Sequence, residues 1–497
     1  MINDENIRLI FGLKVSLLRQ ARGLSSGELA QMAGLSPSYV TEIEKGKKYP
    51  KADKIPALAA ALGTTYDYLI SLQIEDKRVE PLIALLRSNV LSVLPLRLFG
   101  LEPGNLVEIA TQAPERIGAF VNTVAKIART YNFSMEDFFL TALRSYQELN
   151  RNYFADLEEA AAGYARQHLN GRPTLEALEA YLQQEHRYRY GQLDLIQYPQ
   201  LSGLRMVLRP GKEPELLLNP GLSSAQKLFV LAREVGYSLL KLKERSLSYS
   251  WQDPRDFDTL LNNFKATYFA GALLMPEKDF TADIKAFFAA SSWQPEALGA
   301  LVHKWGVSPE MFLHRMTSVL PQRLGIERLF FLRISQAGPD QGAELTKEIH
   351  LGGLHNPHRG ILNEHYCRRW VALDTVKQAR QLQEHGQQGI VCLPQTSTYY
   401  SNGSQYFIIS MAHAQGGLSG KFQSSSIGLY VDEALRKKIR FLNDPAIRHR
   451  MVDETCERCA AVDCMERAAP AVFVQTHADE ASLGRYIQDV IHRRTAL

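Results

Sequence analysis

The chain has 497 residues and a formal net charge of only +4, a length typical of about three domains. This small basic excess fits a protein with one nucleic-acid-binding part better than a chain that coats nucleic acid along its whole length. The N-terminal residues do not have the pattern of a signal peptide or of an Arg-rich transit segment, so we expect neither, and no apolar run approaches the roughly 18 residues of a membrane span. We therefore expect a multidomain cytoplasmic protein that does not bind membranes.

Residues 25–34 predict the first of two short helices. Ser25 can cap the N-terminus of this helix, and Gly34 can adopt the left-handed conformation that ends it. At helical spacing the inward face is apolar and comprises Leu29, Met32 and Ala33.

A second helix is predicted directly after a tight turn. Ser36 can cap it, and Pro37 suits the first helical position, where its missing N–H costs nothing. Val40 and Ile43 point inward. The side chains that face outward are Ser38, Tyr39, Thr41 and Glu42. A helix that docks by one face and keeps its N-terminal outer side chains free has the geometry needed to enter a DNA major groove.

Flanking helices complete this module, with inward residues Ile10, Leu13 and Leu17 upstream and Ile55, Leu58 and Leu62 downstream. The two central helices and the ending Ile43-Glu44-Lys45-Gly46-Lys47-Lys48-Tyr49-Pro50 resemble the helix-turn-helix domain of the Cro/C1-type (XRE) repressor family, although Ser26 stands where the family usually has Gln. Such domains bind double-stranded DNA, commonly as homodimers on paired half-sites. We predict DNA contacts from Arg19, Arg22, Ser36, Ser38, Tyr39, Thr41, Lys45, Lys47 and Lys48. For the lysines the alternative is a solvated loop.

Residues 75–154 predict a helical linker or dimerisation region. Prolines interrupt its helical pattern at positions 81, 95, 103 and 114, and Ser134 to Asp137 has the spacing of a helix cap. The helix that starts there is expected to run past Arg151. Its residues Tyr146, Leu149 and Tyr153 share one side, which indicates either packing within the chain or a dimer seam.

Residues 155–324 change to a mixed pattern, with strand-like pieces at 203–208 and 216–218 before a helix at 226–240. That helix and residues 266–276 resemble the ImmA/IrrE metallopeptidase-like family, whose H-E-x-x-H motif binds zinc. Here Arg233 and Tyr237 occupy the two imidazole positions, Glu234 alone is retained, and the third ligand falls at Lys265. Because the cations Arg233 and Lys265 would repel zinc, we expect that the protein is not an enzyme. We expect Glu234 to pair with Arg233 or Lys265. Alternatively, these three residues and Tyr237 bind a ligand, with the cations on its phosphates.

Residues 325–497 predict an α+β domain with strands at 329–334 and 405–411. The chain has five cysteines, and Cys456, Cys459 and Cys464 form a C-x2-C-x4-C cluster that can share a metal. Cys367 is the better candidate for a fourth ligand, whereas Cys392 lies in an apolar context typical of a buried thiol. All-thiolate sites hold iron–sulfur clusters or zinc, and for zinc a cysteine can be replaced by His355, His358 or His365. Free thiols are the remaining alternative.

The order of these parts resembles the short-chain fatty acyl transcriptional regulator family, including an I-G-L turn at residues 427–429 and the ending at residues 456–470. One departure is Val431, where the family often has a cysteine. The resemblance implies regulation of short-chain fatty acid or central carbon metabolism, a 4Fe-4S cluster and an acyl-coenzyme A effector. Basic residues that can meet coenzyme A phosphates are Arg368, Arg369, Lys421, Lys437, Lys438 and Arg440, and a solvated basic face is the bland alternative.

We therefore predict a multidomain transcriptional regulator. Its expected parts are an all-α helix-turn-helix domain (1–74), a helical linker or dimerisation region (75–154), an α+β ImmA/IrrE-like pseudo-peptidase domain (155–324) and an α+β sensor domain with metal-binding cysteines (325–497). The rival interpretations are a metallopeptidase-type stress regulator that cleaves a partner protein, which the missing zinc ligands disfavour, and a regulator with a purely structural zinc site.

Overall fold

The computed structural model describes residues 4–74, 76, 79, 80, 83, 123, 135–248, 256–338, 342–352, 364–414 and 421–475. It divides into two compact units, residues 1–146 with 252–260 and residues 147–251 with 261–497. The prolines expected to interrupt the linker, and Ser134, lie outside the described residues. In the described part of the chain, no helix is long and apolar enough to cross a membrane.

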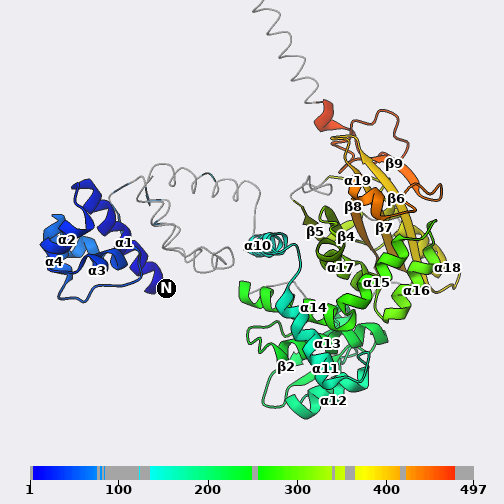
Figure 1. Cartoon of the computed structure of the whole chain (residues 1–497), viewed down its shortest axis with the longest axis horizontal. Helices are drawn as coiled ribbons and strands as arrows, with labels where there is room; N and C mark the ends of the chain where they lie inside the picture. The colour runs from blue at the N-terminus through cyan, green and yellow to red at the C-terminus, as the bar shows by residue number, and fades with distance from the viewer. Residues whose placement is uncertain are drawn as a thin grey trace, which may run out of the picture. The chain divides into compact units, whose positions relative to one another are not determined.

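The described residues 4–74 contain five helices and make up the N-terminal part, drawn in blue in Figure 1. They are α1 (Asp4–Ala21), α2 (Ser26–Ala33), α3 (Pro37–Glu44), α4 (Ile55–Leu62) and α5 (Tyr66–Ile70). Ser25 caps α2 in a capping box with Glu28, and Gly34 ends it at φ 64°, so both predicted helix ends are confirmed. Lys14 is buried and donates from Nζ to the carbonyls of Tyr68 and Ser71 at 2.6 Å, which ties α1 to the end of α5.

The core of this part is apolar and contains Phe11, Val15, Leu29, Ala30, Ala33, Val40, Ile43, Ile55, Leu58 and Leu62. Met32 is 55% exposed, so its prediction as a core residue is wrong. Leu29, Ala30 and Ala33 already fill the narrow strip of this short helix that contacts α3 and α4.

The helix that starts near residue 134 is α10 (Met135–Leu149). It ends at Leu149 because Arg151 and Asn152 adopt φ of 52° and 50°, so the prediction that it runs past Arg151 is wrong. Tyr153 therefore does not share a helix face with Leu149. The Tyr153 hydroxyl instead contacts Glu277 at 3.3 Å, which places it in packing within the chain, whereas Leu149 is 67% exposed.

A mostly helical region with a small sheet follows. Its helices are α11 (Ala155–His168), α12 (Leu175–His186), α13 (Ser224–Leu239), α14 (Phe257–Leu274), α15 (Glu277–Phe288), α16 (Pro295–Trp305) and α17 (Pro309–Val319), with short turns of helix at Pro199–Gly203 and Leu320–Leu324. Its strands are β1 (Arg189–Gln192), β2 (Met206–Arg209) and β3 (Glu215–Leu218), in the order β1-β3-β2. Strand β1 has no counterpart in the sequence prediction, since its alternation is too short to recognise.

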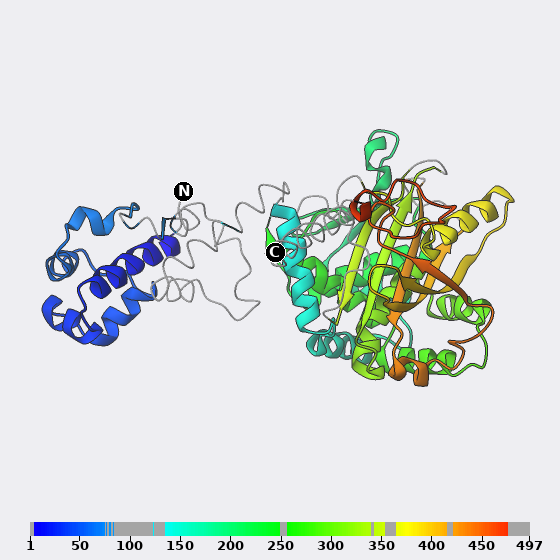
Figure 2. The same cartoon turned by 90° about the horizontal axis from the view of Figure 1, so that it is seen from above.

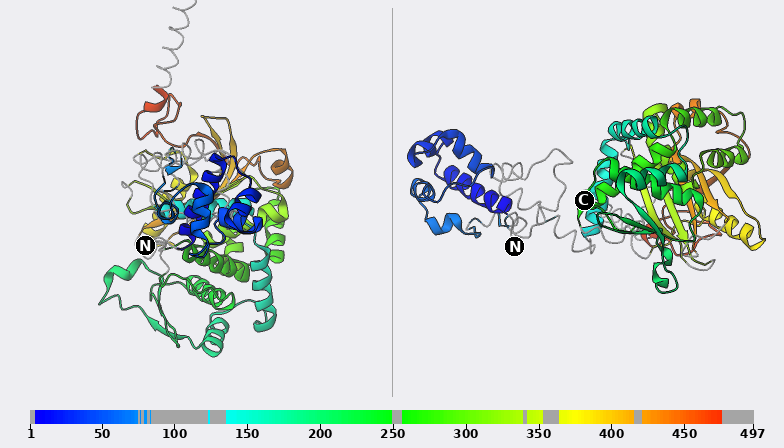
Figure 3. Two further views of the ribbon diagram at one scale, coloured as in Figure 1. Left: turned by 90° about the vertical axis from the view of Figure 1, so that its left-hand side faces the viewer. Right: turned by 90° about the horizontal axis from the view of Figure 1, so that it is seen from below.

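The C-terminal region is built on a six-stranded sheet, whose strands are seen lengthwise in Figure 2 and from two more sides in Figure 3. The strands are β4 (Leu329–Gln336), β5 (Glu344–Leu351), β6 (Ile390–Tyr399), β7 (Gln405–His413), β8 (Phe422–Tyr430) and β9 (Arg448–Val452), in the order β5-β4-β8-β7-β6-β9. Only β9 pairs in parallel, with β6, among the described pairings of this sheet. The helices here are α18 (Val371–Glu384) and α19 (Glu433–Lys438).

The two faces of this sheet are covered by different helices. Side chains alternate along a strand, so neighbouring residues of β4 contact different helices. Phe330 and Leu332 pack in one core with Trp370 and Val371 at the start of α18. Phe331 points to the other face, where its ring lies 5.5 Å from that of His314 on α17. The sheet is thus a layer between α18 and α17.

Residues 427–429 lie inside β8 and do not form a turn, so that expectation is wrong. A Cβ on Gly428 would come within 2.1 Å of the Phe330 ring on the neighbouring strand. The glycine is therefore required by close packing of an aromatic ring over the backbone of β8.

Candidate functional site

Helix α3 has one buried side and one exposed side. Val40 and Ile43 are buried on the inner side, and a Cβ on Gly12 would lie 2.3 Å from the carbonyl oxygen of Ile43, so α1 packs closely on the end of α3. Ser38 and Lys45 are exposed on the outer side, and Thr41, between them at helical spacing, is partly exposed.

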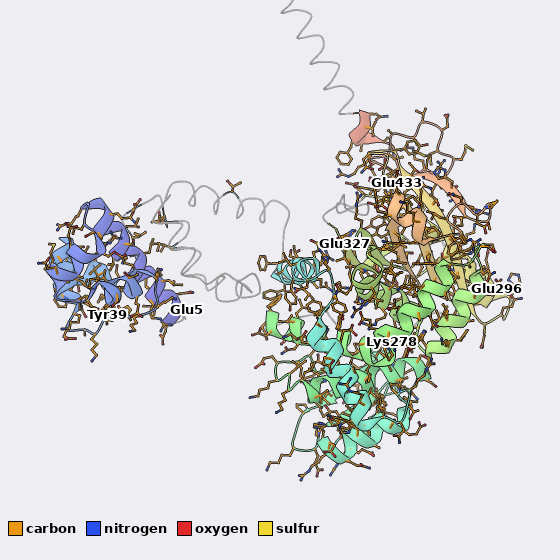
Figure 4. All side chains as sticks on the ribbon, in the orientation of Figure 1. Glu5, Tyr39, Lys278, Glu296, Glu327 and Glu433 are labelled. Atoms are coloured by element: carbon orange, nitrogen blue, oxygen red, sulfur yellow. The ribbon has the colours of Figure 1, made fainter. Side chains whose placement is uncertain are left out.

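The N-terminus of α3 is held by Ser36, whose Oγ accepts the Tyr39 N–H at 3.2 Å. Tyr39, labelled in Figure 4, packs partly against the domain core. Lys48 Nζ lies 2.8 Å from a Glu42 carboxylate oxygen and 5.8 Å from the centre of the Tyr39 ring. Of the outward residues of α3, Ser38 is exposed, whereas Tyr39, Thr41 and Glu42 are half-buried. The Thr41 hydroxyl donates to the Pro37 carbonyl at 3.0 Å.

The two predicted arginine contacts are engaged within the domain. Arg19 contacts Glu44 through Nε at 2.5 Å and Nη2 at 3.2 Å, and it also donates to the Leu24 carbonyl. Arg22 donates to the Ala61 carbonyl at 3.1 Å, near the end of α4. These bonds hold α1 to α3 and α4, so a phosphate contact by either arginine stays a prediction that requires rearrangement.

Glu234 on α13 is fully buried and paired. Its Oε1 accepts from Arg245 Nη2 at 2.7 Å, and its Oε2 accepts from the Tyr188 hydroxyl at 3.0 Å. Burial works against the charge on Arg245, yet the Glu234 carboxylate raises the pKa of Arg245 above its ordinary value. Burial, with Glu234 beside it, raises the pKa of Tyr188 to about 12. The carboxylate is therefore compensated by one guanidinium and one hydroxyl.

The two residues at the imidazole positions bind elsewhere. Arg233 Nη2 donates to Asn263 Oδ1, and the Tyr237 hydroxyl contacts the same oxygen at 3.2 Å. The guanidinium of Arg245 lies 3.9 Å from the centre of the Tyr237 ring. The prediction that Glu234 pairs with Arg233 or Lys265 is wrong, and the partner that sequence reasoning missed is Arg245. No motif spacing indicates a residue beyond the end of the helix.

A backbone bridge brings the cysteine cluster and Cys367 together. Tyr366 pairs with Thr455 as an antiparallel bridge. The Cys367 N–H donates to the Glu454 carbonyl at 3.2 Å, and the Cys456 N–H donates to the His365 carbonyl at 2.8 Å. Burial raises the pKa of Cys367 to about 11, and the neighbouring thiols of Cys459 and Cys456 add to this increase.

The loop that carries the three clustered cysteines is held by Arg467. Its guanidinium donates to the carbonyls of Cys456 at 2.6 Å and Cys459 at 3.1 Å, and also to that of Ala461. The Ala468 N–H lies 3.3 Å from Cys456 Sγ, as a donor to sulfur. Arg467 therefore fixes the backbone of this loop, and the Ala468 N–H is the kind of donor that supports a thiolate.

Charged pairs fasten this loop to the segment before α18. Arg458 donates to both oxygens of Glu364, at 2.7 Å for the shortest contact. His365 Nδ1 lies 2.8 Å from Glu457, which occupies one nitrogen of this candidate zinc ligand. His355 and His358 lie outside the described residues.

Two family models match the chain. The model described as helix-turn-helix matches residues 15–69, and the model described as IrrE N-terminal-like domain matches residues 192–317. The chain therefore carries a helix-turn-helix domain and an IrrE-like domain. The matched ranges lie inside the predicted ranges 1–74 and 155–324, while the boundaries of the four parts stay predictions.

The chain is also similar over nearly its whole length to regulators from Mycobacterium tuberculosis. It is 23% identical to the HTH-type transcriptional regulator RamB over 496 residues, which cover 94% of this chain and 96% of RamB. It is 23% identical to the HTH-type transcriptional regulator PrpR over 507 residues, which cover 95% and 94%. A solved structure titled Mycobacterium tuberculosis transcriptional regulator matches with a TM-score of 0.45 and 20% identity, covering 66% of this chain and 92% of that one.

The IrrE-like domain has the frame of the metallopeptidase family without its zinc chemistry. Both imidazole positions are bonded to Asn263, and the guanidinium of Arg245 contacts Glu234, the carboxylate that would activate water in the peptidase. RamB and PrpR are named as transcriptional regulators. This agrees with the prediction that the chain is not an enzyme.

The thiols fit a metal centre by type but are not arranged as ligands. Burial raises the pKa of Cys459 and, more strongly, that of Cys392, which lies in β6 away from the cluster as a buried thiol. Across the described ranges, no group of three or more His, Cys, Asp or Glu side chains is placed to hold a metal ion. Metal binding by Cys367, Cys456, Cys459 and Cys464 therefore stays a prediction.

The basic residues expected to meet coenzyme A do not gather at one place. Lys421 pairs with Glu344 at 3.1 Å, and Lys438 donates to the Gly325 carbonyl at 3.0 Å. Arg369 donates to the Met451 carbonyl at 3.4 Å. The geometry supports the alternative of a basic surface for these residues.

Proposed function

We propose that this protein is a sequence-specific transcriptional regulator whose helix α3 enters the DNA major groove. The observation that carries the proposal is the division of α3 into a buried side, Val40 and Ile43, and an outer side, Ser38 and Thr41, with the exposed Lys45 at its C-terminal end. The hydroxyls of Ser38 and Thr41 suit base edges, and Lys45 and the exposed Lys47 suit phosphates.

The test compares the selected operator with random DNA. Binding sequences are selected from random duplexes with the full chain, and affinities are measured over a range of salt concentrations. Ser38→Ala and Thr41→Ala should weaken operator binding by about 1 to 3 kcal/mol and leave random DNA unchanged, because only base contacts are lost. Lys45→Gln should weaken both and reduce the salt slope by about 1.

The matched control removes the same charge elsewhere. Lys285 is exposed on α15, and Lys285→Gln should leave both affinities unchanged. If the two hydroxyl variants lost equal affinity for operator and random DNA, α3 would not read bases.

We also propose that the protein binds DNA as a homodimer, since helix-turn-helix domains commonly read two half-sites related by two-fold symmetry. The selected operator should then contain inverted half-sites about one helical turn, 10 to 10.5 base pairs, or a multiple of it apart. Light scattering on the free protein and on its complex with the operator measures the number of chains. A single half-site bound by one chain would refute the dimer.

We propose further that Cys367, Cys456, Cys459 and Cys464 hold a 4Fe-4S cluster, with structural zinc as the alternative. The proposal is supported by the backbone bridge, the Arg467 contacts and the Ala468 donor, and by the resemblance to the fatty acyl regulator family. A bound cluster would make the C-terminal region redox-sensitive. Anaerobic purification, a visible spectrum and iron, sulfide and zinc analysis test it.

Wild type should contain about four irons per chain, abolished by Cys459→Ser and retained by Cys392→Ser, because Cys392 is a buried thiol of β6. Zinc lost with Cys459 would select the structural site. Neither metal in the anaerobic protein would refute both forms of the proposal.

As an effector we propose an acyl-coenzyme A, a proposal that rests on the family resemblance alone. An effector can regulate only if it binds the DNA-competent and incompetent states with different affinity. Operator affinity is therefore measured with saturating acyl-coenzyme A of several chain lengths, with free coenzyme A as the control. Unchanged affinity at every chain length would remove acyl-coenzyme A as the signal.

A further inference from the structure

A cavity of about 50 Å³ lies where the IrrE-like domain meets the C-terminal sheet. Its walls come from α13, α14, α17 and β5, which can be followed in Figure 1. The apolar part of the wall comprises Phe229, Gly271, Met275 and Met311, and the basic part includes Arg205 and Lys347. The cavity thus combines an apolar wall with a cationic one, as pockets for small organic ligands do.

The charges around the cavity are unequal. Arg333 Nη1 lies 3.1 and 3.2 Å from the two oxygens of Glu310, and Lys347 Nζ lies 3.6 Å from the nearer one. Burial acts to raise the pKa of Glu310, but Arg333, Lys347 and Arg205 together hold it well below its ordinary value. Three cations therefore act on one carboxylate.

The fourth cation is neutralised separately and does not share Glu310. Arg315 donates from Nη1 and Nη2 to the two oxygens of Glu158, at 2.6 and 2.8 Å. His314 also lines the cavity, and burial together with Lys347 lowers its pKa well below the ordinary value. The imidazole is thus neutral at pH 7 and adds no positive charge.

Lys347 lies in the wall of the cavity, next to Glu310. Burial, together with Arg333 and Arg205, lowers the pKa of Lys347 to about 8 although Glu310 acts in the opposite direction. The ammonium group is therefore charged at pH 7 and is repelled by Arg333 and Arg205. A second anion in the cavity would relieve this repulsion and form a charge-assisted hydrogen bond.

We propose that this cavity binds a small aliphatic carboxylate, with its carboxylate against Lys347 and its chain against Phe229, Met275 and Met311. A volume of about 50 Å³ holds only a few heavy atoms, since one water occupies about 10 to 15 Å³ on the same measure. Coenzyme A does not fit, so the site is separate from, and does not depend on, the proposed acyl-coenzyme A effector.

Binding is measured by calorimetry on the full chain with sodium acetate, butyrate and hexanoate, at constant ionic strength kept with sodium chloride. Butyrate or acetate should bind saturably at one site per chain, and hexanoate more weakly because its chain exceeds the cavity. Lys347→Gln should weaken binding by roughly tenfold or more. The control Lys285→Gln, which removes an exposed lysine of α15, should have no effect.

A second variant tests the cavity without changing charge. A Cβ on Gly271 meets no atom within 4 Å, so the side chain of Gly271→Leu has room to enter the cavity. It should abolish carboxylate binding while the melting temperature stays equal or rises, because leucine favours a helix more than glycine does. This variant decides the question even if Lys347→Gln does not fold.

Three results would overturn the proposal. The first is wild-type affinity in Gly271→Leu, and the second is equal binding of inorganic phosphate, which has no aliphatic chain. The third is stoichiometric displacement of butyrate by acetyl-coenzyme A, because the two ligands would then share one site.

Discussion

The buried ion pair between Glu234 and Arg245 should stabilise this domain in the place where the metallopeptidase family has its metal site. Arg245→Met tests this. Glu234 has no exposed surface and the Arg245 side chain is 13% exposed, with 2.7 Å between the paired atoms. Removing the guanidinium leaves the carboxylate with the hydroxyl of Tyr188, which donates to Oε2. An uncompensated buried charge costs about 3 to 5 kcal/mol, so we expect the free energy of unfolding to fall by about that amount.

The double substitution Glu234→Met with Arg245→Met removes both charges at once. Because an apolar pair of similar volume no longer carries a desolvation penalty, the double variant should recover to within about 1 kcal/mol of wild type or exceed it. The interaction energy from the cycle should then be roughly 2 kcal/mol or more.

The assay is native-state hydrogen exchange of the α13 amides, which reports the opening of this domain without requiring the whole chain to unfold in one step. Arg209→Met is the control. Arg209 contacts Glu215 at the similar distance of 2.8 Å, but its side chain is 67% exposed. Exposed pairs contribute less than about 1 kcal/mol. Additive single effects would refute the reasoning, as would protection of α13 by added zinc in wild type.

Three further predictions concern the cavity, the cysteine loop and the sheet. Carboxylate affinity in calorimetry should fall as the pH rises above about 8, because Lys347 loses its charge there, whereas Lys347→Arg should keep its affinity at higher pH. Arg467→Gln removes the bonds to three loop carbonyls, and hydrogen exchange of residues 456–469 should become faster by roughly tenfold; unchanged exchange would contradict its role. Gly428→Ala, whose Cβ would lie 2.1 Å from the Phe330 ring, should lower stability by about 1 to 3 kcal/mol in urea unfolding, and Phe330→Leu in the same chain should restore part of it.

The helix-turn-helix domain was predictable because its signals are local. The capping side chain of Ser25 bonds to the third residue after it, and Gly34 ends the helix by its own conformation. The prediction that Met32 is buried was wrong because the face of an eight-residue helix that contacts the core depends on how the neighbouring helices cross it. Helical spacing alone does not contain that crossing angle.

The sites in the second unit depend on contacts between distant residues, and the sequence reasoning missed them for that reason. Arg245 reaches Glu234 from a loop after α13, at a spacing that belongs to no helix period. The cavity combines Arg205, Gly271 and Lys347 from three separate elements. Charge alone did not single out these residues, because lysines and arginines elsewhere in the chain pair with exposed acids.

The cysteine region depends both on local spacing and on contacts between distant residues. Spacing pointed to Cys456, Cys459 and Cys464, and sequence context favoured Cys367 over Cys392. The bridge between Tyr366 and Thr455, which spacing does not reveal, brings Cys367 near the other three. The same segment continues to Trp370, whose Nε1 donates to the Asp453 carbonyl at 3.0 Å at the start of α18.

We therefore expect a change in the cysteine loop to act first on the N-terminus of α18. Trp370 and Val371 pack in one core with Phe330 and Leu332 of β4, and the next residue along β4, Arg333, contacts Glu310 beside the cavity. A packed layer with alternating faces connects the thiols to the cationic wall, since one strand contributes to both sides. A regulator that responds to a metal centre and to a small anion would require such a shared element with two arrangements. Measuring carboxylate affinity in Cys459→Ser tests whether β4 is that element, because an affinity equal to wild type would mean that the two sites are independent.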